Sequence, residues 1–500
     1  MTQRHTTEKH NSRKSWGKAA LTAAILLALT ASGMSIASAC TTFIAGRGAT
    51  VDGSRIIGRT VDSPGLEVMT IASTPAVSRS GPWTFVDGDN KLTVQLPAKS
   101  CAYLATPESK PAPGKPTWDE AVINEHHVIL TATESIYANK AALAADPFVK
   151  NGLEEGTLPT LVMPYVKTAL EGVERLGSLM DKYGSAEGNA VVFADDNETW
   201  YMEMYTGHQW AAVRFPDDAY AVVANDGMLG TIDVNDKANV RTSKDFVKLA
   251  RDHHFLKEEN GKIHVAHTYG QDHRDYSQLR VWAAQRKLSP SLSKNYDVKT
   301  TYDMMVKPDK KISLADAMEL FRYRYEDMGY NVNVHPSNRA IGINRTAAAN
   351  MFWLRDNKPQ IMWVALANPE MSIFLPFYGN VTELPAAYNV ATNEYNRDNA
   401  YFKFRSLSAL AVQDRPGYGK TVRDYWRNME LNLIKAIPDM DAKYIQAGST
   451  SEAANKLCGA PAQAALDAAD TLFNQTFTAF MLSTVQDGSS DATADSTAVK

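Results

Sequence analysis

CTTFIA at residues 40–45 opens the stretch that decides the fold, and VDGS at 51–54 and RIIGRTV at 55–61 complete it. The first and last of these segments are β-branched and apolar, which favours strands, while Asp-Gly-Ser is typical of a turn. A hairpin that turns within residues 46–53 returns the end of the second strand to the start of the first. We therefore expect Arg59 and Asp62 to lie near Cys40.

Residues 1–39 have the pattern of a bacterial secretory signal peptide. Basic residues from Arg4 to Lys18 precede an apolar run over 19–37, and Ala37-Ser38-Ala39 forms a small-residue cleavage site directly before Cys40. We expect residues 1–39 to be removed and the protein to be exported, to the periplasm or outside the cell. The segment 12–16 resembles a twin-arginine signal in which the second arginine is a lysine, so the export route stays open.

A retained membrane anchor is the alternative for this N-terminal segment, because the apolar run is nearly long enough to span a bilayer. Thr22, Thr30 and Gly33 dilute the run, and the small-residue site favours cleavage. No later segment is long and apolar enough to cross a membrane. We expect a mature protein that is soluble outside the cytoplasm.

Composition places the chain among globular proteins, with 500 residues, 44% hydrophobic and 22% charged. Residues 1–39 hold five of the 52 Lys and Arg and one of the 56 Asp and Glu, so the remainder carries 47 against 55, a net charge of −8. This balance argues against nucleic acid or an anionic membrane as partner. No metal or organic cofactor is implied, and a homo-oligomer is compatible with the sequence.

The chain has three cysteines, Cys40, Cys101 and Cys458. In an oxidising compartment an odd count leaves one thiol unpaired. A disulfide between Cys101 and Cys458 leaves Cys40 free. In the alternative, all three are unpaired and the last two are simply buried, and both readings stay open.

Hydrophobic periodicity predicts a mixture of strands and helices. Residues 64–118 read as hairpins and loops, and the tail after Val485 as disordered. The strands at 189–224 form a predicted antiparallel meander, and the mixture favours an α+β layered core over a parallel sheet. The predicted strands are 128–133, 189–194, 198–204, 210–215, 220–224, 350–355 and 360–367, and the predicted helices 159–183, 242–256, 275–286, 313–327, 420–436 and 451–483.

An N-terminal cysteine carries two parts of an acylation apparatus on one residue. The thiol of Cys40 is the nucleophile, and a free α-amine, whose ordinary pKa is about 7.7–8.0, accepts its proton near neutral pH. A cation such as Arg59 favours the thiolate, and Asp62 is the orienting carboxylate. Asn139 and Asn225, which each follow an apolar strand-like run, are candidate donors to the tetrahedral oxyanion.

Lipidation is the competing interpretation of Cys40. A cysteine directly after a signal peptide is also the acceptor of a bacterial lipoprotein, in which alkylation of the thiol and acylation of the amine destroy both catalytic groups. Such a site usually has an apolar residue such as leucine three positions earlier, and this chain has Ala37. The local pattern favours catalysis without deciding it.

Further short motifs follow along the chain. They are CTT at 40–42, DGS at 52–54, RTVD at 59–62, ATESI at 132–136, Asn139, EGV at 171–173, YGSAEGN at 183–189, VAN at 223–225, YS at 276–277, RVW at 280–282 and PFY at 376–378. In these motifs the chain resembles the N-terminal-cysteine dipeptidases, a family of N-terminal nucleophile hydrolases similar to bile-salt hydrolases and penicillin V acylases. The resemblance runs from Cys40 to about residue 390.

The resemblance implies a fold and a set of site residues. The fold is α+β, a four-layer αββα sandwich with additional C-terminal helices. We expect the chain to be divided into a signal peptide over 1–39, a peptidase domain over 40–400, a helical region over 401–484 packed on the core, and a disordered tail over 485–500. The implied roles are Cys40 as nucleophile, Arg59 and Asp62 at the thiol and α-amine, Asn225 and Asn139 as oxyanion donors, and Arg280 as a distal arginine.

Two residues depart from the family pattern: Thr60 stands where members often have Asn, and Asn350 where dipeptidase relatives often have His. The first affects local hydrogen bonding, and the second bears on substrate choice. The leading hypothesis is a secreted or periplasmic dipeptidase acting on dipeptide substrates. The alternatives are an N-acyl amidase of the bile-salt or penicillin V acylase type, and a lipid-anchored, non-catalytic binding protein.

Overall fold

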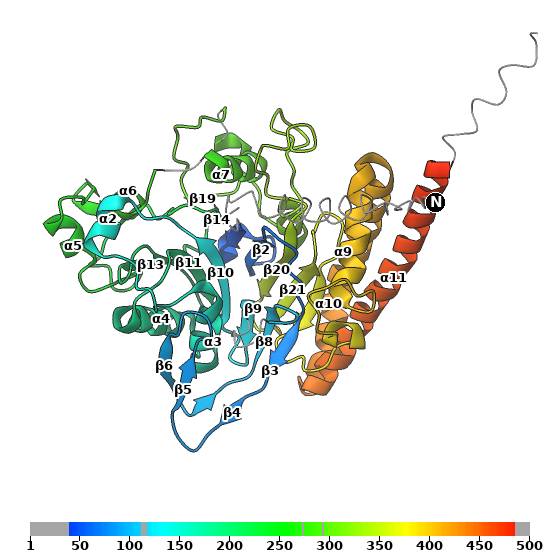
Figure 1. The fold of residues 1–500 in the computed structure, drawn as a ribbon, viewed down its shortest axis with the longest axis horizontal. Helices are drawn as coiled ribbons and strands as arrows, with labels where there is room; N and C mark the ends of the chain where they lie inside the picture. The colour runs from blue at the N-terminus through cyan, green and yellow to red at the C-terminus, as the bar shows by residue number, and fades with distance from the viewer. Residues whose placement is uncertain (1–39, 112–117, 273–274, 293–294, 486–500) are drawn as a thin grey trace, which may run out of the picture. The chain divides into compact units, whose positions relative to one another are not determined.

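The computed structural model describes residues 40–485, apart from 112–117, 273–274 and 293–294 (Figure 1). The predicted signal peptide and the tail after residue 485 lie outside the described residues. The predicted hairpin is present: β1 (Thr41–Ala45) pairs antiparallel with β2 (Arg55–Asp62), with Thr42 opposite Arg59. Its turn contains Gly53 at a positive φ of 73°, a conformation that glycine adopts readily.

The hairpin lies inside a seven-stranded antiparallel sheet. The strand order is β19-β14-β1-β2-β20-β21-β22, which places β1 and β2 in the interior of the sheet and β20 directly beside β2. Both faces of such an interior strand are covered, and all eight residues of β2 are buried, including the charged Arg55, Arg59 and Asp62. The other strands of this sheet are β14 (Tyr220–Val223), β19 (Met305–Val306), β20 (Thr346–Leu354), β21 (Ile361–Leu366) and β22 (Leu375–Tyr378).

A second antiparallel sheet has eight strands in the order β16-β13-β12-β11-β10-β9-β8-β3. The predicted meander is confirmed for β11 to β13. It is wrong for the segment 220–224, because β14 crosses to the first sheet and pairs Tyr220 with Ala45 of β1. The strands are β3 (Ala72–Thr74), β8 (Tyr103–Pro107), β9 (Asp119–Asn124), β10 (Ile129–Ser135), β11 (Asn189–Ala194), β12 (Thr199–Met204), β13 (Trp210–Arg214) and β16 (Val240–Thr242).

Short strands form three small additional sheets. The hairpins expected within 64–118 are among them. These strands are β4 (Val77–Ser78) with β7 (Lys99–Ser100), β5 (Trp83–Val86) with β6 (Thr93–Leu96), and β15 (Thr231–Ile232), β18 (Lys262–His264) and β17 (Glu258–Glu259).

Alternation along the second sheet separates two hydrophobic cores. Ile129 belongs to the larger core, which also contains Ile57 and Phe352 of the first sheet, whereas the adjacent Leu130 belongs to a smaller core with Val173 of α4. Successive side chains of a strand point to opposite faces, so one face of β10 packs toward the first sheet and the other toward helices. β2 and β10 are in contact, which puts the two sheets together.

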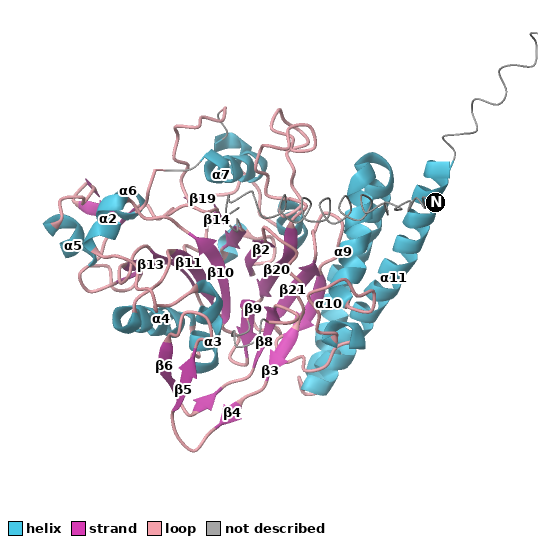
Figure 2. Ribbon diagram, in the orientation of Figure 1, coloured by secondary structure: helices cyan, strands magenta, loops and turns pink. Residues whose placement is uncertain are grey.

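Helices cover the outer faces of the sheets (Figure 2). α3 and α4 pack on the second sheet, α7 contacts β14, and α9 and α11 contact β21 and β22. The helices are α2 (Lys140–Ala145), α3 (Leu158–Val162), α4 (Ala169–Tyr183), α5 (Phe246–Asp252), α6 (Val265–Tyr269), α7 (Asp275–Leu288), α8 (Leu314–Leu320), α9 (Ala400–Ala411), α10 (Lys420–Gln446) and α11 (Ser451–Val485).

Several helix boundaries differ from the predicted ones. The segment 159–183 is two helices, because Pro164 lies between α3 and α4 in a short 3-10 turn and a new helix then begins at the Thr168 cap. The segments 242–256 and 313–327 form only the short helices α5 and α8. α10 continues ten residues past the predicted end at 436. In the described part of the chain, no helix combines the length and apolarity needed to cross a membrane.

Cys101 and Cys458 are free thiols, so the disulfide between them is not formed. Cys458 is buried in α11 beside β22, where its sulfur accepts a hydrogen bond from the Tyr378 N–H at 3.4 Å. Cys101 instead lies near the Met163 carbonyl, at 3.5 Å. Burial raises the pKa of Cys101 to about 11 and that of Cys458 to about 12, so both thiols stay protonated at neutral pH.

Candidate active site

Cys40 lies at the entrance to β1 and is fully buried. The expectation that Arg59 lies near it is confirmed: Arg59 Nη2 is 3.1 Å from the Cys40 sulfur. Two features of the sheet produce this contact. Thr42 is opposite Arg59, and Cys40, two residues before Thr42, points to the same face as both of them. A guanidinium at this distance favours a thiolate over a thiol.

Two buried carboxylates hold the Arg59 guanidinium in place. Its Nη1 pairs with Glu120 on β9 of the second sheet, and its Nη2 pairs with Glu155 at 2.7 Å. All three side chains are at most 7% exposed. A buried charge needs a paired partner, and the fork of arginine provides one nitrogen for each carboxylate. Arg59 therefore bridges both sheets with its head group against the sulfur.

Asp62 ends β2 and is also fully buried. Its Oδ2 accepts hydrogen bonds from Thr60 Oγ1 at 3.1 Å and from Arg339 Nη2 at 2.5 Å, and its Oδ1 accepts from Thr346 Oγ1 at 2.6 Å. Thr60 Oγ1 in turn accepts from the backbone N–H of Thr41 at 3.0 Å. A hydrogen-bonded path thus connects Asp62 to the residue after Cys40, and the departure at Thr60 supplies its middle link.

Asn225 and Arg280 complete the site from the other side of β1. The pairing of Thr42 with Val223, continued by two residues, places Asn225 opposite Cys40. Arg280 of α7 donates from Nη2 to Asn225 Oδ1 at 2.6 Å, and from Nη1 to the Cys40 carbonyl and to Thr41 Oγ1. The contact with Arg280 fixes the orientation of the Asn225 amide, whose NH₂ group is the candidate oxyanion donor.

Asn139 has a different environment. Its Oδ1 accepts from the Ala142 N–H at 2.9 Å and so caps α2. Its Nδ2 donates to the carbonyls of Thr268 at 2.7 Å and Gly270 at 3.3 Å. These contacts use the oxygen and both N–H groups of the amide, which gives Asn139 a structural task. Its role as a second oxyanion donor stays a prediction.

Additional carboxylates lie beside the Arg59 pairs. The Glu187 carboxylate accepts from the Glu155 N–H at 2.7 Å. Burial raises the pKa of Glu155, against the influence of Arg59, and burial together with the Glu155 charge raises the pKa of Glu187 to about 7. Burial also raises the pKa of Glu67. The surroundings of Cys40 therefore hold carboxyl groups whose charge is only partly compensated.

Sequence reasoning missed Glu120, Glu155 and Arg339. One signal was available for Glu120, because the strand DEAVIN at 119–124 holds acidic residues, and a charge that is buried in a sheet requires a partner. Glu155 begins a short 3-10 helix and Arg339 lies in a loop, and neither sequence carries a comparable mark. Their positions result from contacts with β2 that are made across long separations in the chain.

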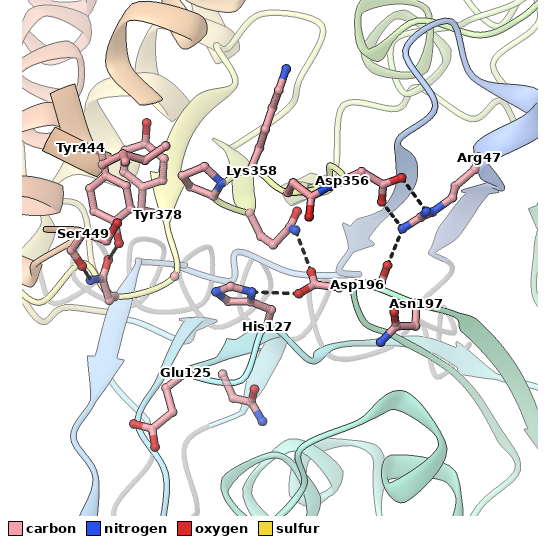
Figure 3. A pocket seen from close by; sticks show the side chains of 17 residues that line it. Arg47, Glu125, His127, Asp196, Asn197, Asp356, Lys358, Tyr378, Tyr444 and Ser449 are labelled. Carbon is pink, nitrogen blue, oxygen red and sulfur yellow. Dashed lines mark hydrogen bonds and ion pairs between the residues drawn. The ribbon is translucent and has the colours of Figure 1, made fainter. Parts of the chain in front are cut away.

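A cavity with a volume of about 840 Å³ lies away from Cys40. Its lining includes Arg47, His127, Asp196, Lys358 and Tyr444 (Figure 3). Cys40 precedes β1 and Arg47 follows it, so the strand separates the two places. His127 and Asp196 form an ion pair there at 3.2 Å, but both are about half exposed. We assign the site by its chemistry rather than by cavity size.

Two groups of described side chains have potential metal ligands within 4.8 Å of one another. One is Cys101, Glu125 and His126, and the other is Glu259, His264 and His267. Neither group includes a residue that contacts Cys40.

The fold and this polar centre define an α+β enzyme built around a buried cysteine. The chain belongs to peptidase family C69, whose family model matches residues 39–428. It is 33% identical over 425 residues to a probable dipeptidase B of Streptococcus pyogenes serotype M1, a match that covers 80% of this chain and 84% of that one. A probable dipeptidase of Latilactobacillus sakei is 32% identical over 402 residues, covering 78% and 84%.

A relative with lower sequence identity is also named as a probable dipeptidase. A probable dipeptidase A of Streptococcus pyogenes serotype M1 is 29% identical over 428 residues, covering 82% of this chain and 89% of that one. Among solved structures, a variant of the conjugated bile acid hydrolase of Clostridium perfringens matches with a TM-score of 0.31 and 11% identity, over 65% of this chain and 89% of that chain.

Proposed function

We propose that the protein is an exported dipeptidase that uses Cys40 as an N-terminal nucleophile after residues 1–39 are removed. The observation that carries this proposal is the contact of the Cys40 sulfur with Arg59 at 3.1 Å, opposite an Asn225 amide fixed by Arg280. The relatives named as probable dipeptidases support the substrate class. The family match that begins at residue 39 supports cleavage directly before Cys40.

Removal of residues 1–39 creates the catalytic base. In the 500-residue chain the nitrogen of Cys40 belongs to a peptide bond and has no basic lone pair. Cleavage converts it into an α-amine that takes the thiol proton, while Arg59 stabilises the thiolate. Asp62, linked through Thr60 to the backbone beside Cys40, orients this N-terminal residue.

The thiolate then attacks the carbonyl carbon of the peptide bond, and the oxygen gains negative charge. Asn225 Nδ2 donates a hydrogen bond to this oxyanion. The α-ammonium returns its proton to the departing amine, the C–N bond breaks, and an acyl-enzyme remains on the sulfur. Water, activated by the same amine, hydrolyses the thioester and regenerates the thiol.

The fold proposed with this mechanism is the four-layer αββα sandwich of N-terminal nucleophile hydrolases. Its support comes from the two antiparallel sheets, the contact between β2 and β10, and the helices on the outer faces. In this arrangement the ends of both sheets surround Cys40. Arg59 of the first sheet and Glu120 of the second meet there.

The decisive experiment is mass spectrometry of the mature N-terminus together with an assay of dipeptide hydrolysis. An unmodified Cys40 and turnover of dipeptides support the proposal. A diacylglyceryl group on Cys40 eliminates it in favour of a lipid-anchored binding protein. Hydrolysis of taurocholate or penicillin V without hydrolysis of dipeptides replaces it with an N-acyl amidase.

Substitution of the nucleophile tests the mechanism itself. We expect Cys40→Ala to abolish turnover while the protein stays folded, because the substitution removes only the thiol. Cys40→Ser keeps a hydroxyl, whose much weaker nucleophilicity leaves little activity. Undiminished hydrolysis by the alanine variant refutes the proposed nucleophile.

A further inference from the structure

Among the groups in contact around Arg59, beside Cys40, carboxyl groups outnumber guanidinium groups. The Arg59 guanidinium is shared by Glu120 and Glu155, and Glu187 lies against the backbone of Glu155. Two almost completely buried carboxylates, Glu120 and Glu155, thus share one guanidinium, and the Glu187 carboxyl group lies beside them. Burial without full charge compensation raises the pKa of Glu155 and of Glu187. A ligand with a positive charge would balance this group.

The distance from the sulfur to Glu155 fits one particular positive group. The Cys40 sulfur and Glu155 Oε1 both contact Arg59 Nη2, at 3.1 and 2.7 Å, so they are no more than 5.8 Å apart. In a dipeptide the α-nitrogen lies about 2.5 Å from the carbonyl carbon that is attacked. That carbon must come within about 3–3.5 Å of the nucleophile. In a dipeptide whose α-ammonium lies on the Glu155 side of the sulfur, this group is therefore within reach of the Glu155 carboxylate.

A second observation points to a ligand at the same place. Asn350 of β20 is directly opposite Arg59, so both side chains project from the same face of the sheet. Asn350 is 1% exposed, and within the described chain neither its Oδ1 nor its Nδ2 has a hydrogen-bond partner. The same is true of Thr42 Oγ1, on the other side of Arg59. Buried polar groups are normally hydrogen-bonded. The amide of Asn350 and the hydroxyl of Thr42, which flank Arg59, could therefore form their hydrogen bonds with polar groups of a bound substrate.

We propose that Glu155 binds the free α-ammonium group of the substrate and that Asn350 hydrogen-bonds its backbone, so that the enzyme requires an unblocked amino terminus. The inference rests on the proposed dipeptidase function and specifies how the substrate is held. Acylation of the α-amine removes the charge that Glu155 recognises.

The first test uses the unaltered mature enzyme and its best dipeptide substrate from a panel. The kcat/KM for this dipeptide is compared with those for its Nα-acetyl derivative and for its C-terminal amide. We expect Nα-acetylation to lower kcat/KM about 100-fold, as loss of a buried charge pair does, and amidation to have a much smaller effect. Equal hydrolysis of the free and acetylated dipeptides overturns the inference but leaves the dipeptidase function intact. Failure to hydrolyse any dipeptide refutes the proposed function instead.

The second test compares Glu155→Gln with Glu120→Gln. Both substitutions remove a carboxylate from the same guanidinium, but Glu155 pairs with the nitrogen that touches the sulfur and Glu120 with the other nitrogen. We expect E155Q to raise KM for the free dipeptide. The ratio of kcat/KM for the free dipeptide to kcat/KM for the acetylated one should fall at least tenfold. E120Q should change kcat/KM for both substrates by the same factor and leave this ratio unaltered. A preference that E155Q leaves unaltered shows that Glu155 acts only through Arg59, and overturns the inference.

Binding without chemistry gives a measurement that does not depend on turnover. In the Cys40→Ala variant, calorimetry compares the affinity for the free and acetylated dipeptides, and then repeats the comparison after adding Asn350→Ala. We expect the free dipeptide to bind at least tenfold more tightly, and Asn350→Ala to weaken it. Equal affinities for the two ligands overturn the inference. If Asn350→Ala weakens the binding of both dipeptides by the same factor, the preference for the free amino group is unaltered, and charge recognition belongs to Glu155 alone, as proposed. If Asn350→Ala leaves both affinities unaltered, Asn350 does not bind the substrate backbone.

Discussion

Replacing Asn225 with alanine or with aspartate separates the two contacts of its amide. The oxygen accepts from Arg280 at 2.6 Å, and the NH₂ group is the proposed donor to the oxyanion. Alanine removes both functions. Aspartate keeps an acceptor for Arg280 and makes the contact an ion pair, but it has no N–H to donate. The two variants therefore differ in stability and share the same catalytic defect.

The magnitudes follow from the burial of the site. Loss of one oxyanion donor lowers kcat by about 100- to 1000-fold. In Asn225→Ala the buried Nη2 of Arg280 also loses its acceptor, which costs about 1–3 kcal/mol of the unfolding free energy. Because the entropy of unfolding grows with chain length, such a loss in a protein of this size lowers Tm by only about 1–3 °C. We expect Asn225→Asp to keep the wild-type Tm, because the aspartate pairs with the guanidinium.

Steady-state hydrolysis of a dipeptide, followed by chromatographic detection of the released amino acids, yields kcat and KM for the three proteins. Thermal unfolding by circular dichroism in the same buffer controls for folding. We expect kcat to fall in both variants and Tm to fall only in Asn225→Ala. If Asn225→Asp keeps kcat within fivefold of wild type, Asn225 is not the oxyanion donor. If alanine leaves Tm unaltered, the contact with Arg280 contributes no stability.

Three further predictions concern residues outside the reacting atoms. Asn139→Ala removes the cap of α2 and should lower the unfolding free energy by about 1 kcal/mol; a fall in kcat as large as that of Asn225→Ala would instead make it a second donor. Burial raises the pKa of Asp119 to about 7, above its ordinary value of 3.8, so the folded state keeps a proton that the unfolded chain has lost. The free energy of unfolding should therefore fall as pH rises from about 4 to 7. Asp119→Asn should make this slope shallower by the share of one proton and stabilise the protein at pH 8 by about 2–4 kcal/mol in denaturant titrations; an unaltered slope contradicts the assignment. Iodoacetamide at pH 8 should leave Cys458 unmodified in the native protein, because burial raises the pKa of this thiol to about 12. After denaturation without reductant, iodoacetamide should modify Cys458, because the thiol is free. Peptide mass spectrometry that finds Cys458 unmodified in the denatured protein contradicts the free thiol.

Local pattern was sufficient for the part of the site that the hairpin builds. Strand propensity and turn chemistry over 40–61 place Arg59 beside Cys40, and the 3.1 Å contact confirms this expectation. A hairpin fixes which residues face each other once its turn is known, and this turn is marked by Asp52, Gly53 and Ser54. Asn225 is different, because its place beside Cys40 depends on the pairing of β14 with β1, which the sequence did not predict.

The remaining parts depend on packing between distant segments, which local periodicity does not report. Arg280 reaches Cys40 across 240 residues, and Glu120 and Glu155 meet Arg59 only because the two sheets pack together. The error at β14 has the same origin. Pro216, Asp217 and Asp218 have turn chemistry, so a simple hairpin was expected there, yet the chain crosses to pair with β1 of the other sheet. Turn chemistry specifies a reversal of direction but not the partner strand.

The register of β1, β2 and β20 is what connects this fold to its chemistry. Thr42, Arg59 and Asn350 lie in one row across three strands and face the same way, with Cys40 beside them. A slip of β2 by one residue would turn Thr60 toward the sulfur and Arg59 toward the opposite face, away from Glu120 and Glu155. Arg59 would then be a buried cation without either carboxylate, at a cost of several kcal/mol. The ion pairs that prepare the site for a substrate therefore also fix the strand register, which ties the catalytic geometry to the stability of the sheet.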